Sequence, residues 1–93
     1  REEMGADNGM LFEYSEPQYI TMWMANTILS LDMFFVGIDG RIINIAQRTV
    51  PHSRETISST EPAISVLEVN AGTASRLGIG PGDLVLHPFF GTD

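Results

Sequence analysis

The chain predicts a mainly-β fold, a small sandwich or a partly closed barrel. Short runs rich in Val, Ile, Tyr, Phe, Trp and Thr recur along it, and these residue types suit a pleated surface. The pair Asp39-Gly40 separates two apolar runs, which is a signal for a β-hairpin. One short segment has the pattern of a helix, too little for alternating strands and helices around a parallel sheet. A layered or closed β fold is how such strands bury their apolar faces.

Two strands are predicted before residue 25. Residues 9–14, GMLFEY, form a short apolar run that the turn cluster Ser15-Glu16-Pro17 should end. Residues 18–24, QYITMWM, favour a second strand because they contain Tyr, Ile, Thr and Trp.

A hairpin follows. Asp39-Gly40 fits a two-residue type I′ turn between an incoming strand at 32–38 and an outgoing strand at 41–47. On the outgoing strand Ile42 is apolar as well as Ile43, so the alternation is imperfect. Part of this hairpin is therefore expected to be covered on both faces.

The second half of the chain begins with a long connection at residues 48–62, which hold two prolines, three serines and three threonines. Loops of this length in a compact domain are often functional or mobile. Residues 63–70, AISVLEVN, predict a strand. One face of this strand is expected to carry Ile64, Val66 and Glu68, and Leu67 and Val69 lie nearer the other.

The predicted helix covers about residues 71–77 and ends at Gly78, a plausible C′ glycine. Asn70 is a candidate N-cap, or the residue just before it. Pro81-Gly82 fits the central positions of a type II turn that leads into a last strand at 84–86.

Composition bounds the function more than it defines it. Ninety-three residues suffice for one domain, residues 1–93. Twelve acidic residues, five arginines and no lysine give a formal charge of −7. Nucleic-acid binding depends on cationic contacts to phosphates, so no nucleic-acid partner is expected. A neutral, cationic or metal-bearing partner fits better, although the acids also keep a small domain soluble.

Neither a membrane span nor a catalytic signature is visible. The longest uncharged run, residues 17–31, is shorter than the ~20 residues a bilayer helix needs, and the N-terminus lacks the pattern of a signal peptide. Phosphate-binding, nucleophile-elbow, zincin and EF-hand motifs are not found. With no cysteine and no spacing argument for His52 and His87, the sequence implies no metal site and no cofactor.

Asp32 and Glu68 are the carboxylates in apolar settings, where each needs a partner. Two such groups brought together would have pKa values pushed apart, as in acid–base or metal chemistry. The structural alternative is that Asp32 caps a turn and that Glu68 pairs with an arginine, and we favour it.

Asn26 also allows two interpretations, a turn residue that satisfies backbone groups or a polar group beside Trp23 in a cleft. Trp23 lies between Met22 and Met24. Such aromatic and Met clusters are usually core and less often line an adaptable ligand groove.

The sequence resembles the bacterial and archaeal family known as domain of unknown function 192. The resemblance includes the blocks Trp23-Met24-x-Asn26-Thr27 and Leu67-Glu68-x-Asn70-Ala71-Gly72, together with Leu31-Asp32 and Gly82-Asp83. It implies a small β-rich, sandwich or jelly-roll-like fold and no established activity. It also implies a periplasmic or membrane-anchored envelope location. Members usually begin with a further strand and a Gly-Leu-Met-x-Arg block, of which Arg1 would be the remainder, so an N-terminal strand is expected to be missing.

The sequence thus predicts a non-enzymatic binding or interaction module of the cell envelope, with an unknown small ligand or a protein as its partner. A hydrolase or metal-assisted enzyme using Asp32 and Glu68, and a purely structural accessory domain, are the alternatives. We expect one polar cluster at one end of the β structure. Its candidate ligand-binding residues are Trp23, Met24, Asn26, Asp32, Glu68 and Asn70.

Overall fold

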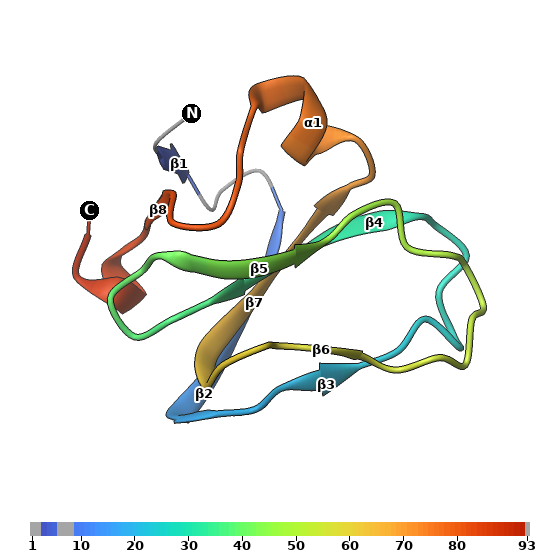
Figure 1. The fold of residues 1–93 in the computed structure, drawn as a ribbon, viewed down its shortest axis with the longest axis horizontal. Coiled ribbons are helices and arrows are strands. Elements are labelled where there is room, and N and C mark those ends of the chain that lie inside the picture. Colours follow the sequence, from blue (N-terminus) through green and yellow to red (C-terminus); the bar gives the residue numbers. More distant parts are fainter. Residues whose placement is uncertain (1–2, 6–8, 93) are drawn as a thin grey trace.

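The computed structural model describes residues 3–5 and 9–92. Arg1, assigned above to the family's N-terminal block, lies outside them. Figure 1 shows the elements in chain order. They are β1 (Glu3–Gly5), β2 (Met10–Gln18), β3 (Thr21–Met22), β4 (Leu31–Val36), β5 (Ile42–Ala46), β6 (Ile57–Ser58), β7 (Ala63–Asn70), α1 (Thr73–Leu77), β8 (Leu84–Leu86) and the 3₁₀ helix η2 (Pro88–Phe90). The predicted mainly-β class is confirmed.

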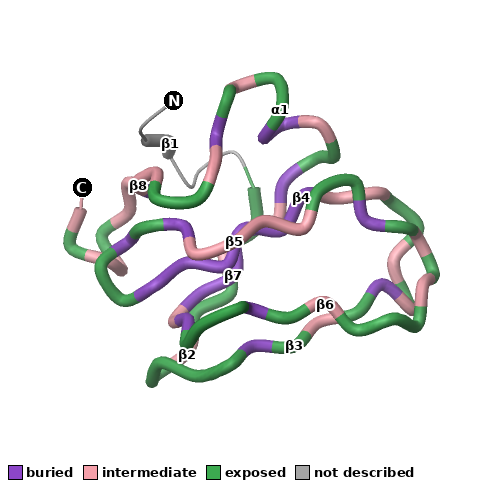
Figure 2. Tube along the Cα trace, in the orientation of Figure 1, coloured by how far each residue is buried: buried purple, intermediate pink, exposed green. Residues whose placement is uncertain are grey.

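A four-stranded antiparallel sheet, in the order β2-β7-β4-β5, organises the molecule. The central strands β4 and β7 carry the runs LDMFFV and AISVLEVN. Both are mostly buried in Figure 2, because they are covered on both faces. The sheet is open, with β2 and β5 as its edges in the described part of the chain. It is not a closed barrel.

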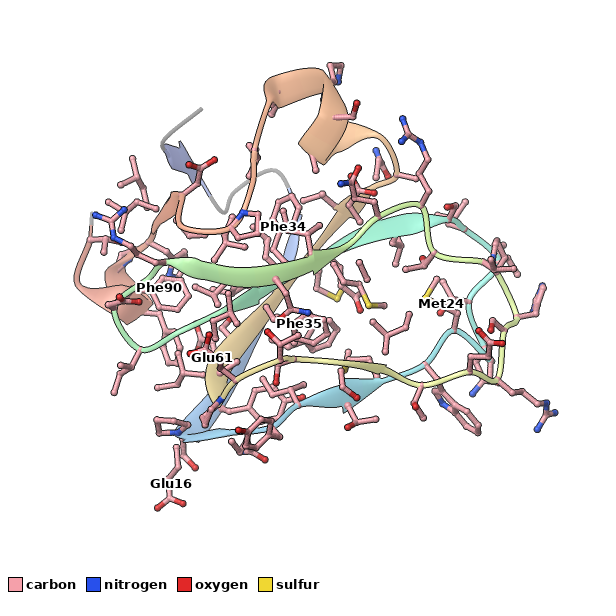
Figure 3. All side chains as sticks on the ribbon, viewed as in Figure 1. Glu16, Met24, Phe34, Phe35, Glu61 and Phe90 are labelled. Atoms are coloured by element: carbon pink, nitrogen blue, oxygen red, sulfur yellow. The ribbon has the colours of Figure 1, made fainter. Side chains whose placement is uncertain are left out.

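Alternation along the central strands separates two cores. Phe34 points towards α1 and Phe35 towards the β3–β6 ribbon (Figure 3), as expected for neighbours in a strand. The helix-side core consists of Phe34, Val36, Ile42, Leu67, Val69, Ala74, Ile79 and Val85. The ribbon-side core consists of Ile20, Met24, Met33, Phe35, Ala63 and Val66. The predicted division of the faces of β7 is confirmed for Val66, Leu67 and Val69.

Two small sheets complete the fold. β3 pairs with β6 in antiparallel orientation to form the ribbon over one face of the main sheet. β1 pairs with β8 in parallel orientation, through the register Glu3↔Leu84 to Gly5↔Leu86. This parallel pair has no counterpart in the sequence-based expectations, because it joins the two ends of the chain.

The predicted break at residues 15–17 is wrong, since β2 continues to Gln18. Pro17 lacks a backbone donor, but an edge strand tolerates this because one side of it needs no partner. The pairing of β2 with β7 becomes irregular between Glu13 and Gln18. The strand predicted at 18–24 is also too long, because β3 contains only Thr21–Met22 and Gln18 still belongs to β2.

The hairpin forms as predicted, but its turn differs. The amide of Gly40 donates to the carbonyl of Gly37. The amide of Gly37 donates to the carbonyl of Arg41. Gly40 has a φ of 81°, and Asp39 is not in the left-handed region that a type I′ turn requires of both central residues. The loop therefore has three residues, and the register shifts between Phe35 and Val36.

The C-terminal predictions are largely confirmed. α1 ends at Gly78, whose φ of 66° is left-handed. Gly82 has a φ of 90°, and the amide of Asp83 donates to the carbonyl of Gly80, as in a type II turn. The N-cap prediction is wrong, because Gly72 occupies that position and provides no side chain.

Candidate functional site

Asp32 is the best-defined polar group of the interior. It is fully buried at the start of β4. Its Oδ2 accepts the amide of Ala74 at 2.9 Å, and its Oδ1 accepts the amide of Arg48 at 2.9 Å. Ala74 is the second residue of α1, where a helical amide has no partner within the helix. The Asp32 carboxylate therefore supplies from β4 the cap that Gly72 cannot supply.

The second bond of Asp32 has a different effect. Arg48 follows β5 with a φ of 49°, a conformation that non-glycine residues adopt rarely. Its amide is held by the carboxylate, and the next residue, Thr49, bonds the start of β4: the Thr49 amide donates to the Leu31 carbonyl at 2.9 Å. The Leu31 amide donates to Thr49 Oγ1 at 3.0 Å. Asp32 thus fixes where the chain leaves the sheet after β5.

Glu68 lies at the same end of the sheet but on the opposite face. Residues that pair directly across antiparallel strands share a face. Asp32 pairs with Val69 of the helix-side core, whereas Glu68 pairs with Met33 of the ribbon-side core. The structure therefore does not bring Asp32 and Glu68 into one cluster, and they cannot flank one substrate.

The Glu68 carboxylate is half-buried, and no hydrogen bond or ion pair joins it to another described residue. Burial raises its pKa above the ordinary value for glutamate, because a charged group loses hydration there. The arginine partner considered above is not found among the described residues. Asn70 is exposed on the same face, and its carbonyl accepts the Thr73 hydroxyl at 2.6 Å.

The other three candidates belong to the segment that follows β3. Met24 is fully buried in the ribbon-side core, between the sheet and the ribbon in Figure 3. Trp23 is 51% exposed, and Asn26 is exposed in the turn closed by the bond from the Thr27 amide to the Met24 carbonyl. Trp23 and Asn26 are therefore both exposed to solvent, whereas Met24 between them is buried.

Residues 23–30 and 48–54 form one substructure, which we call the loop pair. The two segments lie side by side at the end of the molecule remote from β8 and η2 (Figure 1). The Met24 amide donates to the Ser53 carbonyl and the His52 amide to the Thr27 carbonyl. The Ser30 hydroxyl donates to the Thr49 carbonyl at 2.7 Å. These bonds, with those of Leu31, order two segments that contain no helix or strand.

The loop pair displays large apolar side chains. Ile28 is 76% exposed, Val50 67%, Leu29 61% and Trp23 51%. Two hydrogen bonds join the segments here, one between Thr27 and His52 and one between Ser30 and Thr49. On the first segment, Ile28 and Leu29 lie between these two bonds. On the second segment, Val50 lies between them. Sequence reasoning selected only Trp23. The available signal was that Ile28-Leu29 falls in a stretch assigned to no strand, where large apolar residues have no core to enter.

The charge of the loop pair also differs from that of the whole chain. Its two segments contain Arg48 and Arg54 and no acidic residue, although the chain carries −7. Both arginines are exposed, as is His52. A partner that is apolar and acidic therefore complements this end of the molecule, in contrast to the neutral or cationic partner that the overall charge suggests.

The two histidines do not form a site. His52 belongs to the loop pair, and His87 caps η2 by accepting the Phe89 amide at Nδ1, 3.1 Å away. Among the side chains that the structure describes, no three of His, Asp or Glu gather as metal ligands would.

Comparison with known proteins agrees with the resemblance noted from the motifs. The profile of DUF192, described as "Uncharacterized ACR", matches residues 1–87. The chain belongs to the DUF192 family. No curated protein matches this member of the family. Among its described residues, no helix has the length and apolar character to cross a bilayer.

Two solved structures are similar to this DUF192 chain. One is a protein of Sinorhizobium meliloti 1021 described as a "putative transcription regulator", with 51% identity and a TM-score of 0.80. The other is a protein of unknown function from Novosphingobium aromaticivorans DSM 12444, with 45% identity and a TM-score of 0.80. The matches cover 90% of this chain but only 65% and 60% of those proteins. The chain thus spans somewhat less than two thirds of their length.

Proposed function

We propose that this DUF192 domain is a non-enzymatic binding module whose loop pair recognises an apolar, acidic segment of a partner protein. The observation that supports it is the display of four large apolar side chains, each at least half exposed, on segments held by cross-bonds. Exposed apolar surface costs solubility and commonly marks an interaction site. Because hydrogen bonds already order the loop pair, binding loses less conformational entropy than binding by a flexible loop would.

The chemistry of the interior supports the same proposal. The one fully buried carboxylate among the described residues, Asp32, is used by two backbone amides. Glu68 lies on the other face of the sheet. The hydrolase alternative needs both groups at one substrate, so this arrangement disfavours it.

The regulator description of the Sinorhizobium meliloti protein fits a module that binds proteins better than one that binds DNA. Five arginines, no lysine and a charge of −7 provide little attraction for phosphates. The cell envelope is the compartment we propose, on the family resemblance alone, and fractionation of cells expressing the full-length protein tests it.

The test is selection of peptides from a displayed random library against the immobilised domain. We expect peptides that combine aromatic or aliphatic residues with Asp or Glu. Ile28→Ser and Arg54→Gln should each weaken their binding, the first about tenfold, which corresponds to ~1.4 kcal/mol.

Matched controls come from outside the loop pair. Ile38 is 67% exposed in the hairpin loop, and Arg76 is exposed on α1. Ile38→Ser and Arg76→Gln should leave peptide binding unchanged. The proposal would be contradicted if the controls lost as much peptide binding as the loop-pair variants, or if the selection enriched no peptide.

A further inference from the structure

Two methionines flank Glu68 on the ribbon side of the sheet. Met10 of β2 and Met33 of β4 each pair directly with Glu68, one on either side. Paired residues place their Cβ atoms about 4.5–5.5 Å apart on the same face. The three side chains therefore form a row, with a carboxylate between two thioethers.

The two methionines have different environments. Met33 is 1% exposed and belongs to the ribbon-side core, whereas Met10 is 61% exposed on the edge strand. A group held by this row would have one ligand from the interior and one from the surface. The exposed side of Met10 is the path by which it could enter. Methionine has three rotatable bonds, so both sulfurs can lean over the carboxylate.

The carboxylate at the centre has no compensating charge. No cation among the described residues pairs with Glu68, and burial alone raises its pKa. A half-buried carboxylate is stabilised by any cation that enters its vicinity. The nearest donors on the same face are thioethers, which prefer soft monovalent copper to hard cations such as Mg²⁺ or Ca²⁺.

We infer that Met10, Glu68 and Met33 form a binding site for a soft monovalent cation, Cu(I). The methionine sulfurs provide the selectivity, and the carboxylate neutralises the single positive charge. This donor set differs from those considered at the sequence level, which were limited to cysteine, histidine and carboxylate. The inference is independent of the loop pair and of its proposed partner.

The experiment is titration of the purified domain with Ag(I), and with Cu(I) against a competing chelator under reducing conditions. We expect one equivalent to bind and the methyl signals of Met10 and Met33 to shift in NMR spectra. Met10→Leu preserves shape but removes the sulfur, and Glu68→Gln removes the charge. Each should weaken binding at least tenfold.

Two controls separate this site from general thioether or carboxylate binding. Met22→Leu removes a methionine of β3 whose sulfur lies 4.0 Å from the Tyr14 hydroxyl. Glu13→Gln removes an exposed carboxylate of β2. Both should bind Ag(I) within twofold of the wild type. The inference would be overturned if Met10→Leu bound Ag(I) as tightly as the wild type, or if the controls lost as much affinity as the site variants. Tighter binding of Zn²⁺ than of Cu(I) would overturn it as well.

Discussion

At the scale of single residues, Asp32 shows how a carboxylate becomes part of a core. Both of its oxygens accept backbone amides at 2.9 Å, and it is fully buried. Hydrogen bonds to an ionised acceptor are stronger than neutral ones, which offsets part of the cost of burying the charge. The same residue joins β4 to α1 and to the start of the loop pair, so its effect reaches beyond its own strand.

Asp32→Asn should destabilise the domain. The amide has one acceptor oxygen, so either the Ala74 or the Arg48 amide loses its partner and meets an NH₂ group. An unsatisfied buried donor costs about 1–3 kcal/mol, which would lower the Tm by roughly 10 °C in a domain of this size. Thermal melts measure it. Asp39→Asn is the control, since exposed Asp39 accepts the Arg41 amide with one oxygen; an equal loss there would contradict the assignment.

Glu68 predicts a dependence of stability on pH. Burial raises its folded pKa above its ordinary value of 4.5, so between the two values the folded chain binds more protons than the unfolded chain. Stability contributed by this group is present below the ordinary pKa and is lost as pH rises through the folded pKa. Glu68→Gln should therefore be more stable than wild type at pH 7, and the difference should shrink as pH falls through the raised folded pKa and vanish below about pH 4.5. Urea unfolding across this range tests it, and a constant difference would be the contrary result.

At the scale of elements, the contact of β2 with β7 depends on a glycine. A Cβ on Gly9 would lie 2.2 Å from the Glu68 carbonyl oxygen and 2.5 Å from Val69 Cγ1. Both atoms belong to a central strand that cannot move without disturbing two cores. The edge strand carrying Met10 therefore reaches the end of β7 only because residue 9 lacks a side chain.

Gly9→Ala should consequently lower the free energy of unfolding by roughly 1–3 kcal/mol, the range for overpacking a core. Gly80→Ala is the matched control, because nothing lies within 4 Å of its Cβ position and its φ is not left-handed. Gly80→Ala should change the free energy of unfolding by less than about 0.5 kcal/mol, or raise it slightly. Chemical denaturation compares the two, and similar effects would show that the close approach at Gly9 is unimportant.

At the scale of the whole molecule, one sheet divides the domain into regions with different roles. The helix side contains Asp32 and is occupied by packing and capping. The ribbon side contains Glu68 between two methionines, and the loop pair at one end displays Trp23 and Ile28. The net charge of −7 hides a cationic, apolar end, so the composition of the chain describes the surface of that end poorly.

Features that depend on near neighbours in the chain could be predicted from the residues alone. The β class, the hairpin, β7, the end of α1 and the turn at Pro81-Gly82 follow from local residue patterns. The motif blocks were also sufficient to indicate the family. The turn at Asp39-Gly40 was predicted one residue too short, because its loop length depends on the register of the whole hairpin.

Where the polar residues act depends instead on how the strands pair. The periodicity of each strand shows which residues share a face, but not how the faces of β4 and β7 align. A change of register by one residue would move every side chain of a strand to the opposite face of the sheet. That register places Asp32 beneath α1 and Glu68 on the other side, although both stand in similar apolar runs. The loop pair likewise forms through bonds between segments about 25 residues apart in the sequence. Local patterns carry no record of such pairings, because they arise only when the strands on either side have been brought together.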